Sequence, residues 1–282
     1  MNTRTRLKSI VSVTLIMTLI CVILLTLALF LSFDEKLGYF ANGSLPSLFK
    51  AFYTVTLAYI AISCFVYLKK RLIYAETNDI SRTFQPLWIA VGAVAGIYAI
   101  SDLIISALNG SLAHYGMLSS SNAFLLVALS SLGALSLGAY LIYSAIRPAV
   151  PYDPAKVVLV CLSALFPIGV MMKNHFNVVR TVNSVENVLS VFAACALLLY
   201  ICSEAKRNIY RRVDGLYFAS LFISFFALAC LSVSYIIAFI GGAVKDSDRL
   251  RDAVFMLVIA LHLACVVIRA FSFPDESSPE NS

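Results

Sequence analysis

Four polar residues fall on one face of a long apolar segment, close to its end. Tyr98, Asp102, Ser106 and Asn109 are spaced so that an α-helix would place them within a narrow arc. Asp102 lies about seven residues, or roughly 10 Å, inside the end of that helix. A carboxylate in mid-membrane costs about 2.5–3.5 kcal/mol on insertion scales, and such residues usually face the bundle interior or water. The pattern therefore predicts an outward-facing polar site for a small solute or ion, with Asp102 as its charged group.

A purely structural role for Asp102 is the alternative. Its carboxylate would then be hydrogen-bonded by a Ser, a Tyr or a backbone group of a neighbouring helix, or be hydrated near the membrane surface. Lys173 and Arg180 lie in a loop expected on the same side and are candidate partners. The sequence leaves the ligand-binding and the structural role open.

His262 is the second polar residue deep inside an apolar segment, and its helical neighbours are apolar. It is either a hydrogen-bonded packing residue or a site for a proton or another polar ligand. His114 and His175 fall in loops, where their positions do not define a metal site.

Motifs of the common enzyme classes do not occur in the sequence, which has no HExxH, GxSxG, Walker loop or GxGxxG. General acid–base catalysis needs two positioned groups near one bond, and Asp102 is the one acid that the sequence places firmly inside a membrane segment. None of the seven cysteines forms a CxxC pair or has a His at the spacing expected of metal ligands. We therefore predict no catalytic residue, no metal, no cofactor and no disulfide.

The segments that carry these residues are predicted to be membrane helices. Hydrophobic residues make up 61% of the 282 and charged residues 13%, against roughly 25% charged in soluble domains. Runs of about eighteen or more apolar residues indicate transmembrane helices. Eight such segments span about 9–33, 48–68, 87–108, 123–146, 156–172, 187–203, 215–240 and 253–271. Because the fifth and sixth are short, seven spans are the alternative to an all-α, polytopic bundle of eight.

The loop charges predict the orientation. If the N-terminus is cytoplasmic, the cytoplasmic loops hold about twice as many Lys and Arg residues as the loops opposite, as the positive-inside rule requires. Eight spans then place both termini in the cytoplasm, with the plasma membrane as the expected location and 274–282 as a disordered tail. The net charge of +6 is thereby accounted for by topology, and we predict no nucleic-acid partner.

A repeated basic-aromatic sequence suggests internal duplication. "KKRLIY" at 69–74 and "AKRNIY" at 205–210 both follow an even-numbered span. Two parallel four-helix halves, 1–150 and 151–273, would explain the repeat. Recurrent caps imposed by positive-inside charge and aromatic belts would explain it equally.

Small residues predict where the helices approach closely. Gly92 and Gly96 form a GxxxG pair, and Ser130, Ala134 and Gly138 lie four apart on the next span. Such residues allow close backbone contact between helices in lipid. Pro167 is expected to kink the fifth span or to free a carbonyl group.

Two function classes remain. The sequence favours a small solute or ion transporter, channel or binding module with its site around Asp102. The alternative is a membrane sensor, scaffold or partner subunit that binds a protein through the basic loops 69–85 and 204–214. The lipid bilayer is the one partner common to both.

Overall fold

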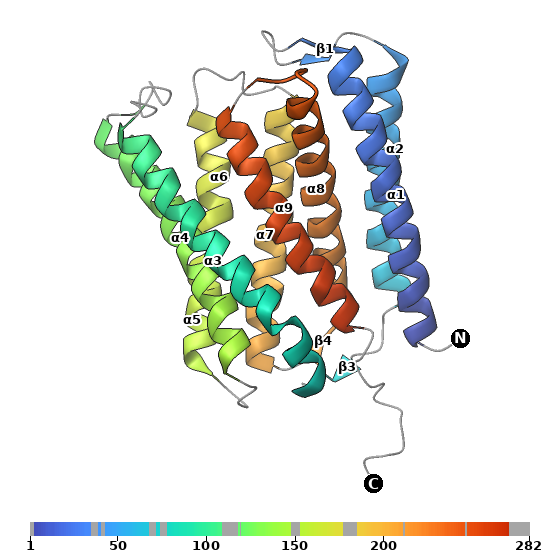
Figure 1. Cartoon of the computed structure of the whole chain (residues 1–282). Coiled ribbons are helices and arrows are strands. Elements are labelled where there is room, and N and C mark those ends of the chain that lie inside the picture. The colour runs from blue at the N-terminus through green and yellow to red at the C-terminus, as the bar shows by residue number, and fades with distance from the viewer. Residues whose placement is uncertain are drawn as a thin grey trace.

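The computed structural model describes residues 3–34, 39–40, 43–67, 72–73, 78–108, 118, 120–147, 153–176, 185–210, 212–245 and 247–270. This part of the chain is a bundle of long helices (Figure 1). The helices are α1 (Thr3–Leu31), α2 (Ser44–Tyr67), α3 (Asn78–Leu108), α4 (Ser120–Ile146), α5 (Pro154–Ser163), α6 (Leu165–Phe176), α7 (Val185–Tyr210), α8 (Gly215–Ile240) and α9 (Ser247–Ala270).

Within the described residues, eight segments are long and apolar enough to cross a membrane, with α5 and α6 together forming the fifth. The predictions of an all-α helical bundle and of eight spans are thus confirmed. This is the architecture of a multi-pass membrane protein.

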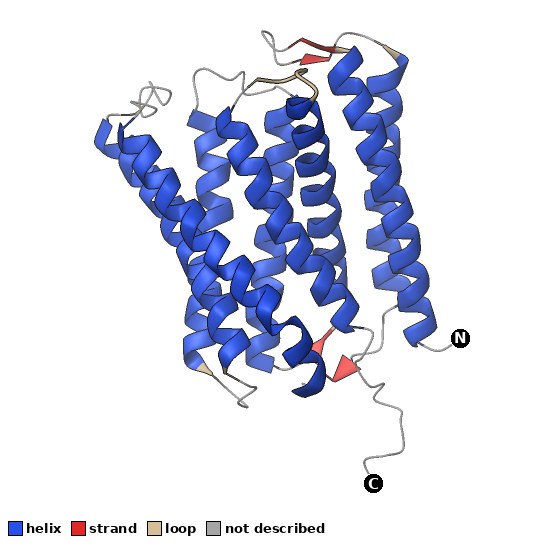
Figure 2. Cartoon of the chain, viewed as in Figure 1, coloured by secondary structure: helices blue, strands red, loops and turns tan. Residues whose placement is uncertain are grey.

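Two short antiparallel strand pairs lie at opposite ends of the bundle (Figure 2). Strand β3 (Leu72–Ile73) pairs with β4 (Arg212–Val213) at the end where α1 begins, which we call the N-side. Strand β1 (Phe33–Asp34) pairs with β2 (Tyr39–Phe40) at the other end, the far side. The N-side pair links the segment after α2 to the segment after α7.

Helices α3 and α4 meet backbone to backbone. A Cβ on Gly92 would lie 2.7 Å from the carbonyl oxygen of Gly138, and a Cβ on Gly138 would lie 2.6 Å from that of Gly92. A Cβ on Gly96 would meet nothing within 4 Å. Close packing is therefore confirmed for Gly92 and Gly138, whereas the prediction is wrong for Gly96, because the crossing of the two helices brings only one turn of the GxxxG pair against α4.

Helix α4 also contacts α6 closely. A Cβ on Gly133 would lie 2.0 Å from the backbone nitrogen of Phe166, and one on Gly169 would lie 2.6 Å from the Cβ of Ser130. The α5–α6 break falls three residues before Pro167, which has no N–H to donate to the carbonyl of residue 163. The predicted interruption of the fifth span is confirmed.

Helices α1 and α2 pack on each other and on α8, to one side of the bundle (Figure 1). The Ser234 hydroxyl on α8 donates to the carbonyl oxygen of Val22 on α1 at 3.1 Å. Helix α8 and the remaining helices enclose the polar interior described below. The division into halves 1–150 and 151–273 stays a prediction, and 274–282 lies outside the described residues.

Candidate functional site

Asp102 is buried and paired with two cations. Its side chain is 3% exposed, and its Oδ2 atom lies 2.5 Å from Nζ of Lys173 on α6. Its Oδ1 atom accepts a hydrogen bond from Nη2 of Arg251 on α9 at 2.9 Å. The Ser131 hydroxyl on α4 donates to Oδ2 at 3.4 Å. One carboxylate thus connects α3 to three other helices.

The charges around Asp102 balance. Asp252 lies 3.7 Å from Nη2 of Arg251 and accepts a hydrogen bond from the Tyr98 hydroxyl at 2.9 Å. Two carboxylates therefore face Lys173 and Arg251. We call this group the Asp102 cluster, defined as Tyr98, Asp102, Ser131, Lys173, Arg251 and Asp252.

The predicted polar stripe on α3 faces the bundle interior where it is described. Tyr98 and Asp102 belong to the cluster, and Ser106 is buried one turn nearer the far side. Asn109 and Arg180 lie outside the described residues. Lys173 was one of two candidate partners from sequence, whereas Arg251, which is 149 residues away in the chain, was not anticipated.

An aromatic layer lies on the N-side of this cluster. The rings of Tyr98 and Phe255 stack with centroids 4.1 Å apart. Phe166 meets both edge-on, at 6.1 Å from Tyr98 and 5.2 Å from Phe255. These rings come from α3, α6 and α9. On each helix the ring lies nearer the N-side than the charged residue of the cluster, which is Asp102, Lys173 or Arg251. The aromatic layer separates the charged groups of the Asp102 cluster from the cavity described next.

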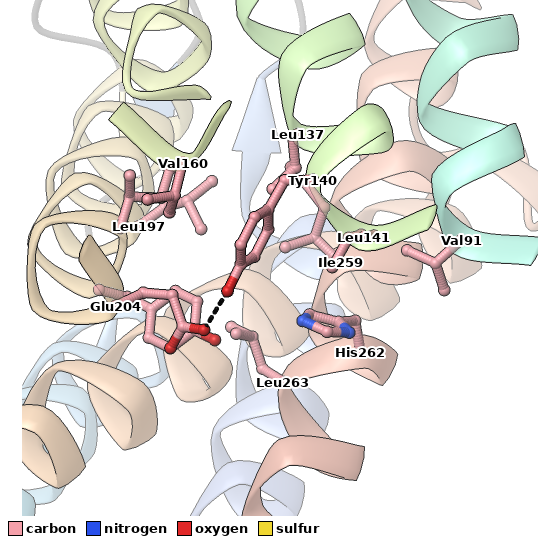
Figure 3. Close-up of a pocket in the computed structure, with 12 residues that line it drawn as sticks. Val91, Leu137, Tyr140, Leu141, Val160, Leu197, Glu204, Ile259, His262 and Leu263 are labelled. Atoms are coloured by element: carbon pink, nitrogen blue, oxygen red, sulfur yellow. Dashed lines mark hydrogen bonds between the residues drawn. The ribbon is translucent and has the colours of Figure 1, made fainter. Parts of the chain in front are cut away.

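A small cavity of about 20 Å³ lies between the aromatic layer and the N-side (Figure 3). Its walls come from α3, α4, α5, α7 and α9 and are mainly aliphatic, but Tyr140, Glu204 and His262 also line it. His262 is 6% exposed, and its Nδ1 atom is buried with no hydrogen-bond partner among the described residues. Its ring meets Trp88 edge-on at a centroid distance of 5.8 Å. The cavity therefore presents one unsatisfied polar atom and a carboxylate.

The Glu204 carboxylate is the centre of a second buried cluster. The Tyr140 hydroxyl donates to its Oε1 atom at 2.5 Å, and the Tyr217 hydroxyl donates to Oε2 at 3.0 Å. Arg207 forms an ion pair with Oε1. Asn208 donates from Nδ2 to the Tyr140 hydroxyl at 3.1 Å and to the Glu204 carbonyl at 2.9 Å. We call Tyr140, Glu204, Arg207, Asn208 and Tyr217 the Glu204 cluster.

The Glu204 cluster corrects the expectation that Asp102 is the one acid inside the membrane segments. The sixth span was predicted to end at 203, but α7 continues to Tyr210, and Glu204 is 4% exposed. The helix continues because Tyr140 and Tyr217, from two other helices, satisfy the carboxylate. Tyr200, Glu204 and Asn208 are spaced four apart, so the stripe rule that identified Asp102 would also have identified this site.

The chemistry of both clusters is ionic and hydrogen-bonding. Within the described part of the chain, no group of three or more His, Cys, Asp or Glu residues could hold a metal ion. Comparison with protein-family models, with curated proteins and with solved structures finds no match to this chain.

Proposed function

We propose that this multi-pass membrane protein carries a small solute or ion across the bilayer between α3, α4, α6, α7 and α9. The observation that carries the proposal is the order of layers between these helices. From the far side they are the Asp102 cluster, the aromatic layer, the cavity and the Glu204 cluster. Carriers bind substrates near the bilayer midplane between elements that move relative to one another. A small cavity with a separable polar contact on each side suits that movement.

The cost of the two clusters supports a functional role. Charged residues inside membrane helices are expensive and generally mark substrate or ion pathways. Replacing a buried ion pair by apolar side chains is often neutral or stabilising, so a requirement for folding alone would not favour these charges. Asp102 and Glu204 are nevertheless both less than 5% exposed in this bundle.

The α3–α4 pair is the moving unit in this proposal. Gly92 and Gly138 hold the two helices together, and the close approach of Gly133 to α6 supplies a pivot near the middle of α4. At the far side the pair is attached through Asp102, and at the N-side through Tyr140. Rocking about the pivot would break one attachment while the other is kept.

The Asp102 cluster is the outer gate and the first binding site in this proposal. A solute entering between Tyr98 and Ser106 would compete with Lys173 or Arg251 for Asp102. In this proposal the N-side faces the cytoplasm and the far side faces the cell exterior, an orientation that the excess of Lys and Arg in the predicted cytoplasmic loops supports.

The test is transport by the purified protein in liposomes. A panel of alkali cations, amino acids, sugars and small organic acids would be screened by solid-supported-membrane currents and by thermal unfolding. A ligand at about one hundred times its dissociation constant adds roughly 2.7 kcal/mol to stability, which raises the unfolding midpoint. We expect one solute class to give both signals.

The variant Asp102→Asn combined with Lys173→Gln tests the site. Asp102→Asn alone leaves two partly buried cations facing a neutral amide, and breaking a fully buried pair in this way costs about 3–5 kcal/mol. The double variant removes one charge of each sign, so it should fold and yet give no current. Lys206→Gln, which removes the half-exposed pair with Asp214, is the control and should transport normally. A folded double variant with parental currents would contradict the assigned role of Asp102.

A second candidate function is that of a sensor, scaffold or partner subunit. The pairing of β3 with β4 favours it, because this pairing joins the basic segments 69–85 and 204–214 at one surface. Neutralising Lys69, Lys70 and Arg212 should then release a co-purifying protein and leave the solute panel silent. Arg207 is unsuitable for this test because it pairs with buried Glu204.

A further inference from the structure

We propose that the cavity is a proton-transfer site in which one water molecule links His262 to Glu204. This inference rests on the proposed transport function, since it names the proton as the ion that the bundle moves. Two independent features meet at the site: a cavity of about 20 Å³ and a buried Nδ1 atom without a partner among the described residues.

The cavity has the size for a single water. A water needs about 10–15 Å³ of such space together with two to four polar partners. His262 Nδ1 supplies one partner. Glu204 supplies the other, because Oε2 accepts a hydrogen bond from Tyr217 and a carboxylate oxygen has two acceptor positions. Figure 3 shows Glu204 on α7 beside the Tyr140 hydroxyl and His262 on α9 on the other side of Leu263, all among the residues that line the cavity.

The groups that face the cavity, directly or through Glu204, allow proton exchange. They are Tyr140 from α4, Tyr200, Glu204 and Arg207 from α7, and Tyr217 from α8. The cavity-lining residues of α3 and α5 are the apolar Val91 and Val160. Imidazole is the side chain that gains and loses protons most readily near neutral pH. His262 and Glu204 are thus the pair suited to exchange a proton inside the span.

The transfer step balances without another reactant. An imidazolium at His262 gives its Nδ1 proton to the water oxygen while the water passes one of its own protons to Oε2 of the Glu204 carboxylate. The products are a neutral imidazole, an intact water and a carboxylic acid, and no electrons are exchanged. The reverse step restores the starting state. Since α7 ends six residues after Glu204, this carboxylate is the group nearer the N-side.

The state of the His262 ring is the first measurement. The chain has three histidines, so a background with His114→Gln and His175→Gln leaves one imidazole to observe. In nanodiscs, ¹⁵N-histidine NMR reads its protonation, and water-edited spectra read its contact with water. We expect a water-contacting ring that titrates reversibly, with a midpoint displaced by Glu204→Gln. A dry ring in one neutral state from pH 4 to pH 9 would overturn the inference and leave the solute panel unaffected.

Proton flux is the second measurement. Liposomes with a trapped pH dye would be given an inward proton gradient and a potassium–valinomycin clamp. The parent should acidify the lumen, and His262→Gln, which keeps a polar group but carries no proton at this pH, should lose that flux. His262→Leu should lose it as well, whereas His175→Gln should not. Flux retained by His262→Gln overturns the inference.

The two measurements separate this inference from the proposed function. Solute currents without proton flux in the parent would overturn proton transfer and leave the carrier proposal intact. Absence of both currents and flux would overturn both.

Discussion

The α3–α4 contact allows a stability prediction with an internal control, because Gly92 and Gly96 lie one turn apart on α3. The Gly92→Ala methyl would lie 2.7 Å from the carbonyl oxygen of Gly138 and 2.6 Å from Cγ1 of Ile142. Ordinary contact begins at 3.4 Å, so the oxygen contact is short by about 0.7 Å. The Gly96→Ala methyl would meet nothing within 4 Å.

The magnitude follows from the difference between these variants. Overpacking that shifts backbone costs about 1–3 kcal/mol. Replacing Gly by Ala inside a helix returns about 1 kcal/mol, and this gain is the same for Gly92 and Gly96. The propensity term therefore cancels, and Gly92→Ala should be less stable than Gly96→Ala by about 1–3 kcal/mol.

Reversible unfolding in mixed micelles with increasing SDS, followed by far-UV circular dichroism, measures this difference. Gly138→Ala should behave like Gly92→Ala, since its methyl would lie 2.6 Å from the Gly92 carbonyl oxygen. Equal stability of the Gly92 and Gly96 variants, or a lower stability of Gly96→Ala, would refute the assigned contact.

Three further predictions concern a helix cap, the aromatic layer and the Glu204 cluster. Asp214→Ala removes the cap that accepts from the backbone nitrogen of Tyr217, and it should lower the free energy of unfolding by about 1 kcal/mol in the same SDS titration. Phe255→Ala opens the aromatic layer and should cost about 3–5 kcal/mol; a cost below that of the cap variant would show that the rings do not pack as described. Tyr140→Phe removes a hydrogen bond to a charged group, worth about 1.5–3 kcal/mol, and so should favour opening at the N-side. A cysteine introduced at Ser106 in a background without the native cysteines should then react more slowly with a membrane-impermeant thiol reagent, and faster labelling would contradict the rocking movement.

The sequence predicted the spans because apolar length is a local property. Each of the eight expected segments overlaps one span of the structure, and the break near Pro167 was also foreseen. Helix ends were harder to predict, because the end of a helix depends on the hydrogen-bonding groups that the neighbouring helices supply. Glu204 reads as a loop residue by hydropathy and becomes a buried helix residue through hydroxyl groups that lie 64 positions before it and 13 positions after it.

One partner of Asp102 could be predicted from the sequence, and the other could not. Lys173 was a candidate because it lies just beyond a predicted span on the expected side, whereas Arg251 sits among three acids and two other bases in a segment with no clear pattern. Only the position of α9 beside α3 selects it. Periodicity gives the face of a helix, and the packing of other helices decides what that face meets.

The distribution of polar contacts over the helices constrains how the bundle can open. Asp102 attaches α3 to α6 and α9 at the far side, and Tyr140 attaches α4 to Glu204 of α7 at the N-side. If α3 and α4 moved independently, an opening at one end would not affect the other. The backbone contact between Gly92 and Gly138 joins the two helices, so in the proposed rocking movement separation at one end would press the opposite end closed. A substrate that weakens the Asp102 contacts would therefore strengthen the Glu204 contacts, and in this proposal the exchange of a proton at Glu204 would act on the far gate through the same pair of helices.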